Sequence, residues 1–106
     1  MTTKVGGQKE KDFDKIVPKF DFQGVDEETE KKFVELARAT YKRYYFGELK
    51  YHMEIAKEMK KAIDEEFGKS WHCIVGKNFG SFFSYEVGCV CQFWFEHFCF
   101  LIFKHG

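Results

Sequence analysis

The sequence has no net charge, a single proline and no long hydrophobic run. Its 17 basic and 17 acidic residues cancel, so no overall electric field recruits nucleic acid, acidic lipid or an acidic substrate. The densest apolar stretch, residues 93–103, is interrupted by Glu96 and His97 and is shorter than the roughly 20 residues of a membrane-spanning helix. The lysines near the start occur without an apolar segment, which argues against a secretory signal. These absences predict a cytosolic protein without membrane insertion.

Cysteines are few, and their spacing is unlike a disulfide framework. The four thiols belong to Cys73, Cys89, Cys91 and Cys99, and in a cytosolic chain we expect them to be reduced. Cys89 and Cys91, taken with His97 and Cys99, raise the alternative of a zinc site. Strong zinc motifs combine two paired knuckles, however, and only one loose pair occurs here. Core packing is the favoured interpretation, and no metal or other cofactor is expected.

No catalytic group of residues emerges from the sequence. His72 and Cys73 suggest a base and a nucleophile, but neighbouring residues of a strand point to opposite faces and cannot hydrogen-bond to each other. Gly76 and Gly80 lack the lysine and serine that a phosphate-binding loop requires. The aromatic residues near the C-terminus occur without the interleaved Arg or Lys of a single-strand nucleic-acid site. We therefore expect neither an enzyme nor a nucleic-acid-binding protein.

Charged and aromatic residues are unevenly distributed along the 106 residues, which are enough for one domain. Of the 34 Asp, Glu, Lys and Arg residues, 30 lie in residues 1–70, whereas 11 of the 21 aromatic residues lie in the last 36. Because the last 36 residues are so apolar, both faces of the structure that they form must be covered. Two charged helices can cover one face, and a second subunit can cover the other.

The first 70 residues predict a polar arm, an edge strand and two helices. Residues 1–14 are polar and are expected to be disordered, and residues 15–23 alternate loosely around a proline, which restricts them to a sheet edge. Asp26 is placed to cap the first helix, and Gly47 and Gly68 are placed to end the two helices. Helical spacing predicts the buried stripes, which are Phe33, Leu36, Ala37, Thr40, Tyr41 and Tyr44 in the first helix and Leu49, Met53, Ala56, Met59, Ile63 and Phe67 in the second.

After Ser70 the pattern changes from helix to short apolar strands. These are expected at residues 71–75, 81–86, 89–95 and 98–104, with a tight turn within residues 76–80. The last two are apolar at nearly every position, as in a sheet that is buried on both faces. Glu96 and His97 join them, which is an awkward pair because a two-residue hairpin turn favours residues that tolerate a positive φ. The turn is expected to be strained or to relax into a longer loop.

The C-terminal residues carry a motif of unusual composition. Residues 71–81 read WHCIVGKNFGS, and residues 101–106 read LIFKHG. The sequence closely resembles the small dynein light chain family, whose members share WHCIVG, then Arg or Lys, then NFGS, and end in LLFKSG. The resemblance runs without a gap through residues 71–106, whereas residues 1–48 match in pattern rather than identity. The chain is identified as a divergent member of this family, with the domain at residues 15–106.

The resemblance implies an α+β fold, with two helices packed on an antiparallel β-sheet, and a homodimer formed sheet to sheet by strand exchange. Residues 81–86 are the expected exchanged strand, and its free edge is expected to pair with an extended segment of a partner protein. The residues that match the family's peptide groove are Lys57 from the other subunit, Asn78, Phe79, Gly80, Ser81, Phe82, Phe83, Ser84, Tyr85, Val90, Gln92, Trp94, Cys99 and Leu101. Those matched to the dimer interface are Lys60, His72, Ser81, Phe82, Phe83, Ser84 and Tyr85. Protonation of His72 in acid is expected to separate the dimer.

Several groove residues differ from the family pattern. Tyr85 stands where a histidine is usual, Gln92 and Trp94 stand where tyrosines are usual, and Cys99 replaces an alanine. His105 replaces the penultimate serine, so modification of that hydroxyl cannot regulate this chain. A bulkier Trp94 and a polar Gln92 change the floor of the groove. The groove is expected to persist, while the family's preference for a Gln-containing motif is expected to change.

The resemblance implies a non-enzymatic, dimeric hub protein of the cytoplasm, associated with the cytoskeleton. It is expected to bind short linear motifs of dynein intermediate chain and other partners, and thereby to promote their dimerisation or their attachment to the motor. Two identical grooves would bind bivalent partners by avidity. Two alternatives stay open: a structural or scaffold protein of a specialised cell surface that kept the dimer but lost the groove, and an inhibitor of one enzyme.

Overall fold

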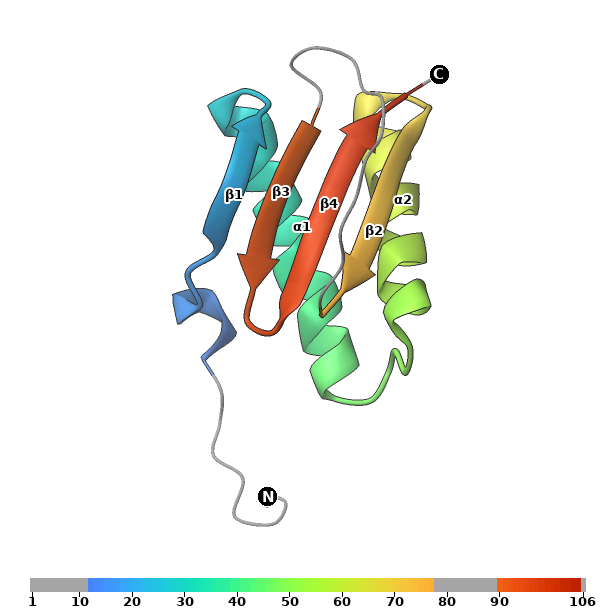
Figure 1. Ribbon diagram of the computed structural model, residues 1–106. Coiled ribbons are helices and arrows are strands. Elements are labelled where there is room, and N and C mark those ends of the chain that lie inside the picture. Colours follow the sequence, from blue (N-terminus) through green and yellow to red (C-terminus); the bar gives the residue numbers. More distant parts are fainter. Residues whose placement is uncertain (1–11, 78–89, 106) are drawn as a thin grey trace.

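The described part of the chain folds as a layer of two helices packed on one face of a four-stranded antiparallel sheet (Figure 1). The computed structural model describes residues 12–77 and 90–105. The elements are a short 3-10 helix (Phe13–Lys15), β1 (Lys19–Gly24), α1 (Glu27–Tyr45), α2 (His52–Phe67), β2 (Trp71–Gly76), β3 (Val90–Phe95) and β4 (Phe98–Lys104). The predicted α+β architecture is confirmed, and the strand expected at residues 81–86 lies outside the described residues.

β1 and β2 form the two edges of this sheet, whose order is β1-β3-β4-β2. The predicted edge strand is confirmed, although its pairing begins after Pro18, at Lys19, because proline has no N–H to donate to a ladder. A register shift between Phe20 and Phe22 makes a bulge where β1 pairs with β3. β4, the most apolar strand, pairs with both β3 and β2 and therefore lies inside the sheet.

α1 begins at a capping aspartate and lies against the sheet. Asp26 Oδ1 accepts a 2.7 Å hydrogen bond from the N–H of Thr29, which satisfies a donor of the first helical turn. The predicted stripe of α1 is confirmed, because Phe33, Ala37, Thr40 and Tyr41 are buried and Leu36 and Tyr44 pack against the core. Gly47 follows the helix with a φ of +83°, which glycine adopts without steric cost, so the predicted helix end is also confirmed.

α2 faces the sheet with a narrower stripe than the predicted one. Ile55, Met59 and Ile63 are fully buried and lie four residues apart, so they follow one another along a single helix face. The prediction that Met53 is buried is wrong, because its side chain is 76% exposed. Met53 precedes Ile55 by two residues, and residues two apart on a helix do not share a face. Neither of the two described helices has the length and apolar character needed to cross a membrane.

The last turn of α2 is acidic, against the sense of the helix dipole, and local partners offset this charge. Asp64 accepts a 2.6 Å hydrogen bond from Lys60 Nζ and a 3.3 Å hydrogen bond from the N–H of Trp71. Glu66 forms a 3.0 Å ion pair with Lys32 of α1. Asp64 thereby connects α2 to the first residue of β2.

We expect the contribution of Asp64 to stability to disappear in acid. The hydrogen bond from Lys60, followed by that from the N–H of Trp71, holds the pKa of Asp64 below its ordinary value of 3.8, although partial burial opposes both. A carboxyl group with a depressed folded-state pKa stabilises the fold above its unfolded-state pKa, and this contribution is lost as the pH falls through the folded-state pKa. Asp64→Asn should lower the free energy of unfolding by about 1 kcal/mol at neutral pH and by much less in strong acid. Urea denaturation at both pH values measures this, and an equal loss at both would contradict it.

β3 and β4 are joined by Glu96 and His97 alone, so the turn is the strained alternative of the two expected. Phe95 and Phe98 pair directly across it. Glu96 has a φ of +57°, in the left-handed region where a Cβ atom crowds the following carbonyl oxygen. The chain therefore holds a side-chain-bearing residue in a conformation that glycine adopts more easily.

Replacing Glu96 with glycine should stabilise the fold by about 1 kcal/mol, because the strained φ then carries no Cβ. Glu96→Ala is the matched control, since it removes the same carboxylate but keeps the Cβ. Thermal and urea denaturation of both variants separate the effect of losing the carboxylate from the effect of losing the Cβ atom. A glycine variant no more stable than the alanine variant would show that the turn stores no such strain.

Aromatic side chains fill the layer between the helices and the sheet. Phe33, Phe93, Phe95 and Phe100 are fully buried. The rings of Phe93 and Phe100 are stacked with their centroids 5.3 Å apart, and Phe33 contacts Trp71 edge to face at 5.5 Å. These buried phenylalanines therefore form a large part of the core on the helical side of the sheet.

Residues 12–17 pack against α1, before the first strand begins. Phe13 is 7% exposed, and its ring contacts that of Tyr45 edge to face at 5.3 Å. Arg38 of α1 donates hydrogen bonds to two backbone carbonyl oxygens of this segment. The core thus reaches into the last residues of the expected arm, while residues 1–11 lie outside the described residues.

Candidate functional site

The sheet has one face toward the helices and one face away from them. Successive residues of a strand point to opposite faces. The helix-facing residues of β3 and β4 belong to the core, and they are Cys91, Phe93, Phe95, Phe98, Phe100 and Ile102. Their neighbours point the other way, and they are Val90, Gln92 and Trp94 on β3 and Cys99, Leu101 and Phe103 on β4. We call this second side of the sheet the outer face; it is turned toward the viewer in Figure 1.

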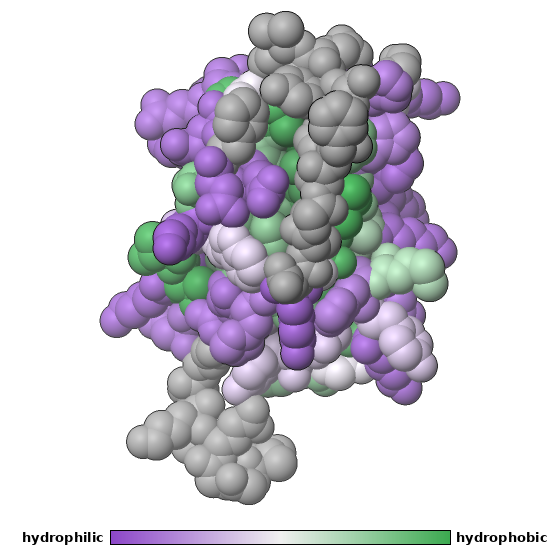
Figure 2. All heavy atoms as spheres, viewed as in Figure 1, coloured by the Kyte–Doolittle hydropathy of each residue, from purple (hydrophilic) through white to green (hydrophobic). Residues whose placement is uncertain are grey.

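Five residues matched to the peptide groove lie together on the outer face, and they are Val90, Gln92, Trp94, Cys99 and Leu101. Gln92 pairs directly with Leu101 across β3 and β4, and Trp94 pairs with Cys99. Figure 2 looks onto this face, where hydrophobic residues gather over the middle of the sheet and hydrophilic residues surround them. The structure therefore brings the described groove residues of β3 and β4 into one group.

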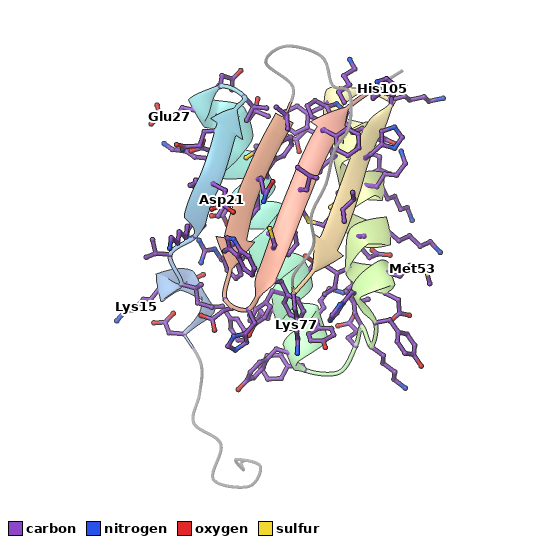
Figure 3. All side chains as sticks on the ribbon, viewed as in Figure 1. Lys15, Asp21, Glu27, Met53, Lys77 and His105 are labelled. Carbon is purple, nitrogen blue, oxygen red and sulfur yellow. The ribbon has the colours of Figure 1, made fainter. Side chains whose placement is uncertain are left out.

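Asp21 of β1, which no sequence motif marks, joins two of these residues (Figure 3). Its Oδ2 accepts a 2.8 Å hydrogen bond from Trp94 Nε1 and a 3.3 Å hydrogen bond from Gln92 Nε2. Gln92 Nε2 also lies 3.6 Å from Cys99 Sγ. The carboxylate thereby fixes the orientation of both Gln92 and Trp94, the two residues that replace the family's tyrosines.

The other described residues of the predicted site lie apart from this group. Lys57 is exposed on α2, on the helical side of the sheet, and the resemblance assigns it to the groove of another subunit. Lys60 is half-buried and bonds to an aspartate of its own helix. His72 lies on the outer side of β2, with Nε2 3.2 Å from the carbonyl oxygen of His105 and its ring centroid 5.3 Å from that of Phe103. A single chain therefore does not bring either lysine to the groove residues.

The remaining predicted site residues lie outside the described part of the chain. They are Asn78, Phe79, Gly80, Ser81, Phe82, Phe83, Ser84 and Tyr85. The groove and dimer contacts expected of them stay predictions.

The two edges of the described sheet differ in their protection against further pairing. Pro18 precedes β1, Lys19 is exposed on it, and the strand is bulged, and all three features discourage another strand from adding to an edge. β2 pairs with β4 in one regular register and contains no proline. Its Ile74 is 41% exposed. Of the two described edges, β2 is therefore the less protected against further pairing.

The backbone groups that β2 offers on its open side follow from the ladder. In an antiparallel pair, successive residues alternate between bonding to the partner strand and pointing away from it. The N–H of His105 donates to the carbonyl oxygen of Ser70, so residues 72, 74 and 76 bond to β4. The N–H and C=O groups of Cys73 and Val75 consequently point to the open side.

The buried thiols have a packing role in the described structure. Cys73, Cys91 and Cys99 are free cysteines. Burial raises the pKa of Cys91 to about 12 and also raises the pKa of Cys73, so these thiols stay protonated at neutral pH, and a protonated thiol is a weak nucleophile. Within residues 12–77 and 90–105, no group of three His, Cys, Asp or Glu residues is placed to hold a metal ion.

Known proteins resemble this chain in both sequence and fold. Residues 18–105 match the family model described as dynein light chain type 1. The cytoplasmic dynein light chain of Emericella nidulans is 32% identical over 91 residues, which cover 86% of this chain and 92% of that protein. The cytoplasmic dynein light chain 1 of Debaryomyces hansenii is 38% identical over 80 residues, which cover 76% and 82%. The solved dynein light chain-like domain of a Fasciola hepatica calcium binding protein has a TM-score of 0.72 at 18% identity, covering 92% of this chain and 100% of that one.

These comparisons confirm the resemblance predicted from residues 71–81 and 101–106. The curated relatives are named as cytoplasmic proteins, in agreement with the predicted location. The solved structure shows that the fold persists at low sequence identity. The chain therefore belongs to the dynein light chain type 1 family, a family of non-catalytic adaptors.

Proposed function

We propose that this dynein light chain forms a homodimer by strand exchange and binds short extended segments of partner proteins by β-strand augmentation. Dynein intermediate chain is the first partner proposed, and the bound dimer would attach partners to the motor or bring two partner chains together. The observation that carries the proposal is the outer face, where five residues matched to the family's groove lie together on the side of the sheet that the helices leave uncovered.

The open edge of β2 supports the dimeric part of the proposal. Its outward N–H and C=O groups, at Cys73 and Val75, form no ladder with any strand among the described residues. Residues 81–86 of a second subunit would pair there and extend the sheet. The exposed side chain of Ile74 would then lose contact with water, which favours association.

The floor of the groove supports a changed peptide preference. In strand augmentation, main-chain hydrogen bonds supply affinity for any sequence, and side-chain pockets supply selectivity. Trp94 donates its Nε1–H to Asp21, so the indole offers its ring surface rather than a hydrogen bond to a guest. Gln92 donates to the same carboxylate. We therefore propose that this groove selects guest side chains by shape and apolar contact more than by hydrogen bonds to Trp94.

An array of short peptides that cover dynein intermediate chain tests the proposal, with scrambled peptides of equal composition as controls. The purified full chain is applied to the array, and its mass in solution is measured by sedimentation equilibrium. A dimer that binds a few peptides selectively is the expected result. A monomer at neutral pH would contradict strand exchange, and a dimer that binds no peptide would favour the scaffold alternative over peptide binding.

A further inference from the structure

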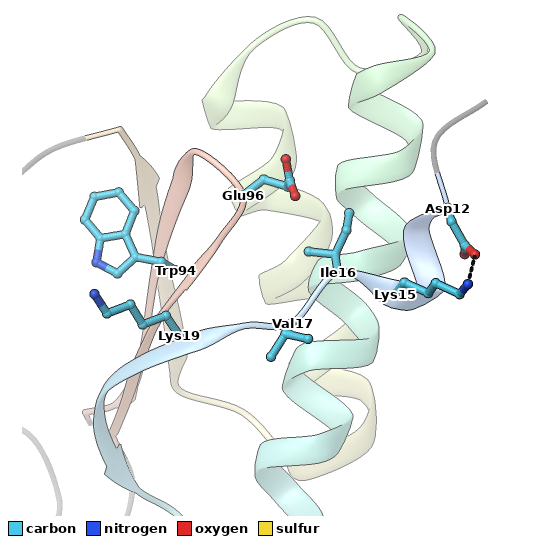
Figure 4. Close-up of a pocket in the computed structure, with 7 residues that line it drawn as sticks. All are labelled: Asp12, Lys15, Ile16, Val17, Lys19, Trp94 and Glu96. Atoms are coloured by element: carbon cyan, nitrogen blue, oxygen red, sulfur yellow. Dashed lines mark ion pairs between the residues drawn. The ribbon is translucent and has the colours of Figure 1, made fainter. Parts of the chain in front are cut away.

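A hollow of about 600 Å³ opens beside one end of the outer face (Figure 4). Four of its lining residues belong to the segment at residues 12–17, and the others are Lys19, Trp94 and Glu96. Trp94 is thus shared between this hollow and the group of groove residues. The hollow therefore continues the outer face at the point where β3 meets its turn.

The segment that walls the hollow is anchored in the core. The buried ring of Phe13 contacts Tyr45 at 5.3 Å and Phe46 at 5.8 Å. Arg38 donates to the carbonyl oxygen of Ile16 at 3.1 Å and also to that of Phe13, while its guanidinium lies 5.2 Å from the ring centroid of Phe95. These contacts fix the backbone of the segment on both sides of its 3-10 turn. The match to the family model begins at residue 18, directly after this segment.

The charges around the hollow balance, so they do not select a charged guest. Lys15 forms an ion pair of 3.8 Å with Asp12, and Lys19 and Glu96 add one charge of each sign. An acidic or basic guest residue would meet as much repulsion as attraction. Selectivity must therefore come from the uncharged part of the lining.

The uncharged part of the lining is apolar and accessible. Val17 is 82% exposed, and Ile16 and the Trp94 indole complete this surface. Asp21 holds the indole through a 2.8 Å hydrogen bond, so its ring is already oriented before a guest arrives. The hollow is open toward solvent, and its volume of about 600 Å³ leaves room for one large side chain.

We propose that the hollow is an additional subsite of the guest groove, which takes a large apolar or aromatic side chain of the residue that flanks the strand-paired part of a bound peptide. This inference rests on the proposed function, because it requires a peptide on the outer face. The guest side chain covers Val17 and packs against the Trp94 indole, and water leaves both surfaces. The segment at residues 12–17 thereby lengthens the peptide that the chain recognises.

Calorimetric titration of the full chain with one binding peptide from the array tests this subsite. The peptide is made with Phe, Ala or Glu added at one end and then at the other. We expect the Phe version to bind roughly three- to tenfold more tightly than the Ala version at one of the two ends, because an aromatic side chain gains the contact with Trp94. The Glu version should bind no more tightly than the Ala version, because the surrounding charges balance.

Two variants that each place an aspartate on an exposed apolar residue show where the added Phe binds. Val17→Asp puts a charge on the apolar lining of the hollow, so the Phe and Ala versions of the peptide should bind this variant with equal affinity. Met53→Asp is the matched control, because Met53 is 76% exposed and lies on the opposite side of the molecule from Lys15 (Figure 3). In Met53→Asp the Phe version should keep its full advantage in affinity over the Ala version.

Equal affinities of the Phe and Ala versions at both ends would overturn the subsite, and so would a gain that survives in Val17→Asp. Either result would leave the proposed function intact, since the Ala version still binds. Absence of binding by every peptide on the array would instead overturn the proposed function, and the subsite with it.

Discussion

Phe93→Ala is expected to remove about 3–5 kcal/mol from the free energy of unfolding. Phe93 is fully buried in β3, its ring is stacked on that of Phe100 at 5.3 Å, and it contacts the ring of Phe20 at 5.5 Å. Truncation therefore loses the transfer free energy of a whole aromatic ring and leaves a cavity between the helices and the sheet. The expected loss is a large part of the roughly 5–15 kcal/mol that stabilises a typical domain. Urea denaturation followed by circular dichroism measures it.

Val17→Ala is the control for Phe93→Ala, since it also truncates an apolar side chain, but one that is 82% exposed. Surface changes of this kind alter the free energy of unfolding by less than about 0.5 kcal/mol. If the loss in Phe93→Ala were as small as that, the central position of Phe93 in the aromatic core would be refuted.

Val75→Pro is expected to raise the dissociation constant of the proposed dimer by roughly a hundredfold or more. The alternation along β2 turns the N–H of Val75 away from β4, so proline removes a donor that an added strand needs while the existing ladder keeps its bonds. Sedimentation equilibrium measures the dissociation constant, and circular dichroism checks that the variant stays folded.

Val75→Thr is the matched control for the proline variant, because threonine keeps both the β-branched shape and the N–H. It should leave the dimer intact. Ile74→Lys provides a second route that leaves the backbone unchanged, since an exposed lysine on an edge strand discourages further pairing. A dimer of undiminished affinity in both Val75→Pro and Ile74→Lys would show that subunits do not meet at this edge.

The helices could be predicted from the sequence because their buried side chains recur at helical spacing. Asp26 caps α1 as predicted, and the stripe of α1 follows the helical period through its whole length. The error at Met53 has a specific cause. The predicted stripe of the second helix starts at Leu49, which is buried but precedes the first residue of α2, His52, so its position does not set the phase of the helix.

Only those residues of the candidate site that alternate along a single strand could be predicted from the sequence. Val90, Gln92 and Trp94 share a face because they are two residues apart on one strand, and the motif at residues 71–81 indicated what that face is for. Asp21 was not predictable, because it reaches Trp94 from 73 residues away and from a strand whose bulge breaks the alternation. The packing of Phe13 against Tyr41 and Tyr45 of α1 likewise joins residues that are far apart in the sequence, and no sequence pattern predicts it.

The strand order has a consequence for the newly synthesised chain. β1 pairs only with β3, and β2 pairs only with β4, among the described strands. β3 and β4 follow β1 and β2 in the chain and leave the ribosome after them, so neither early strand can close its ladder until β3 and β4 have emerged. The two helices can form in the meantime, but their apolar faces have no sheet to cover. Folding is therefore expected to wait until β4 has emerged, and a nascent chain stalled before Phe98 should remain sensitive to protease along its whole described length.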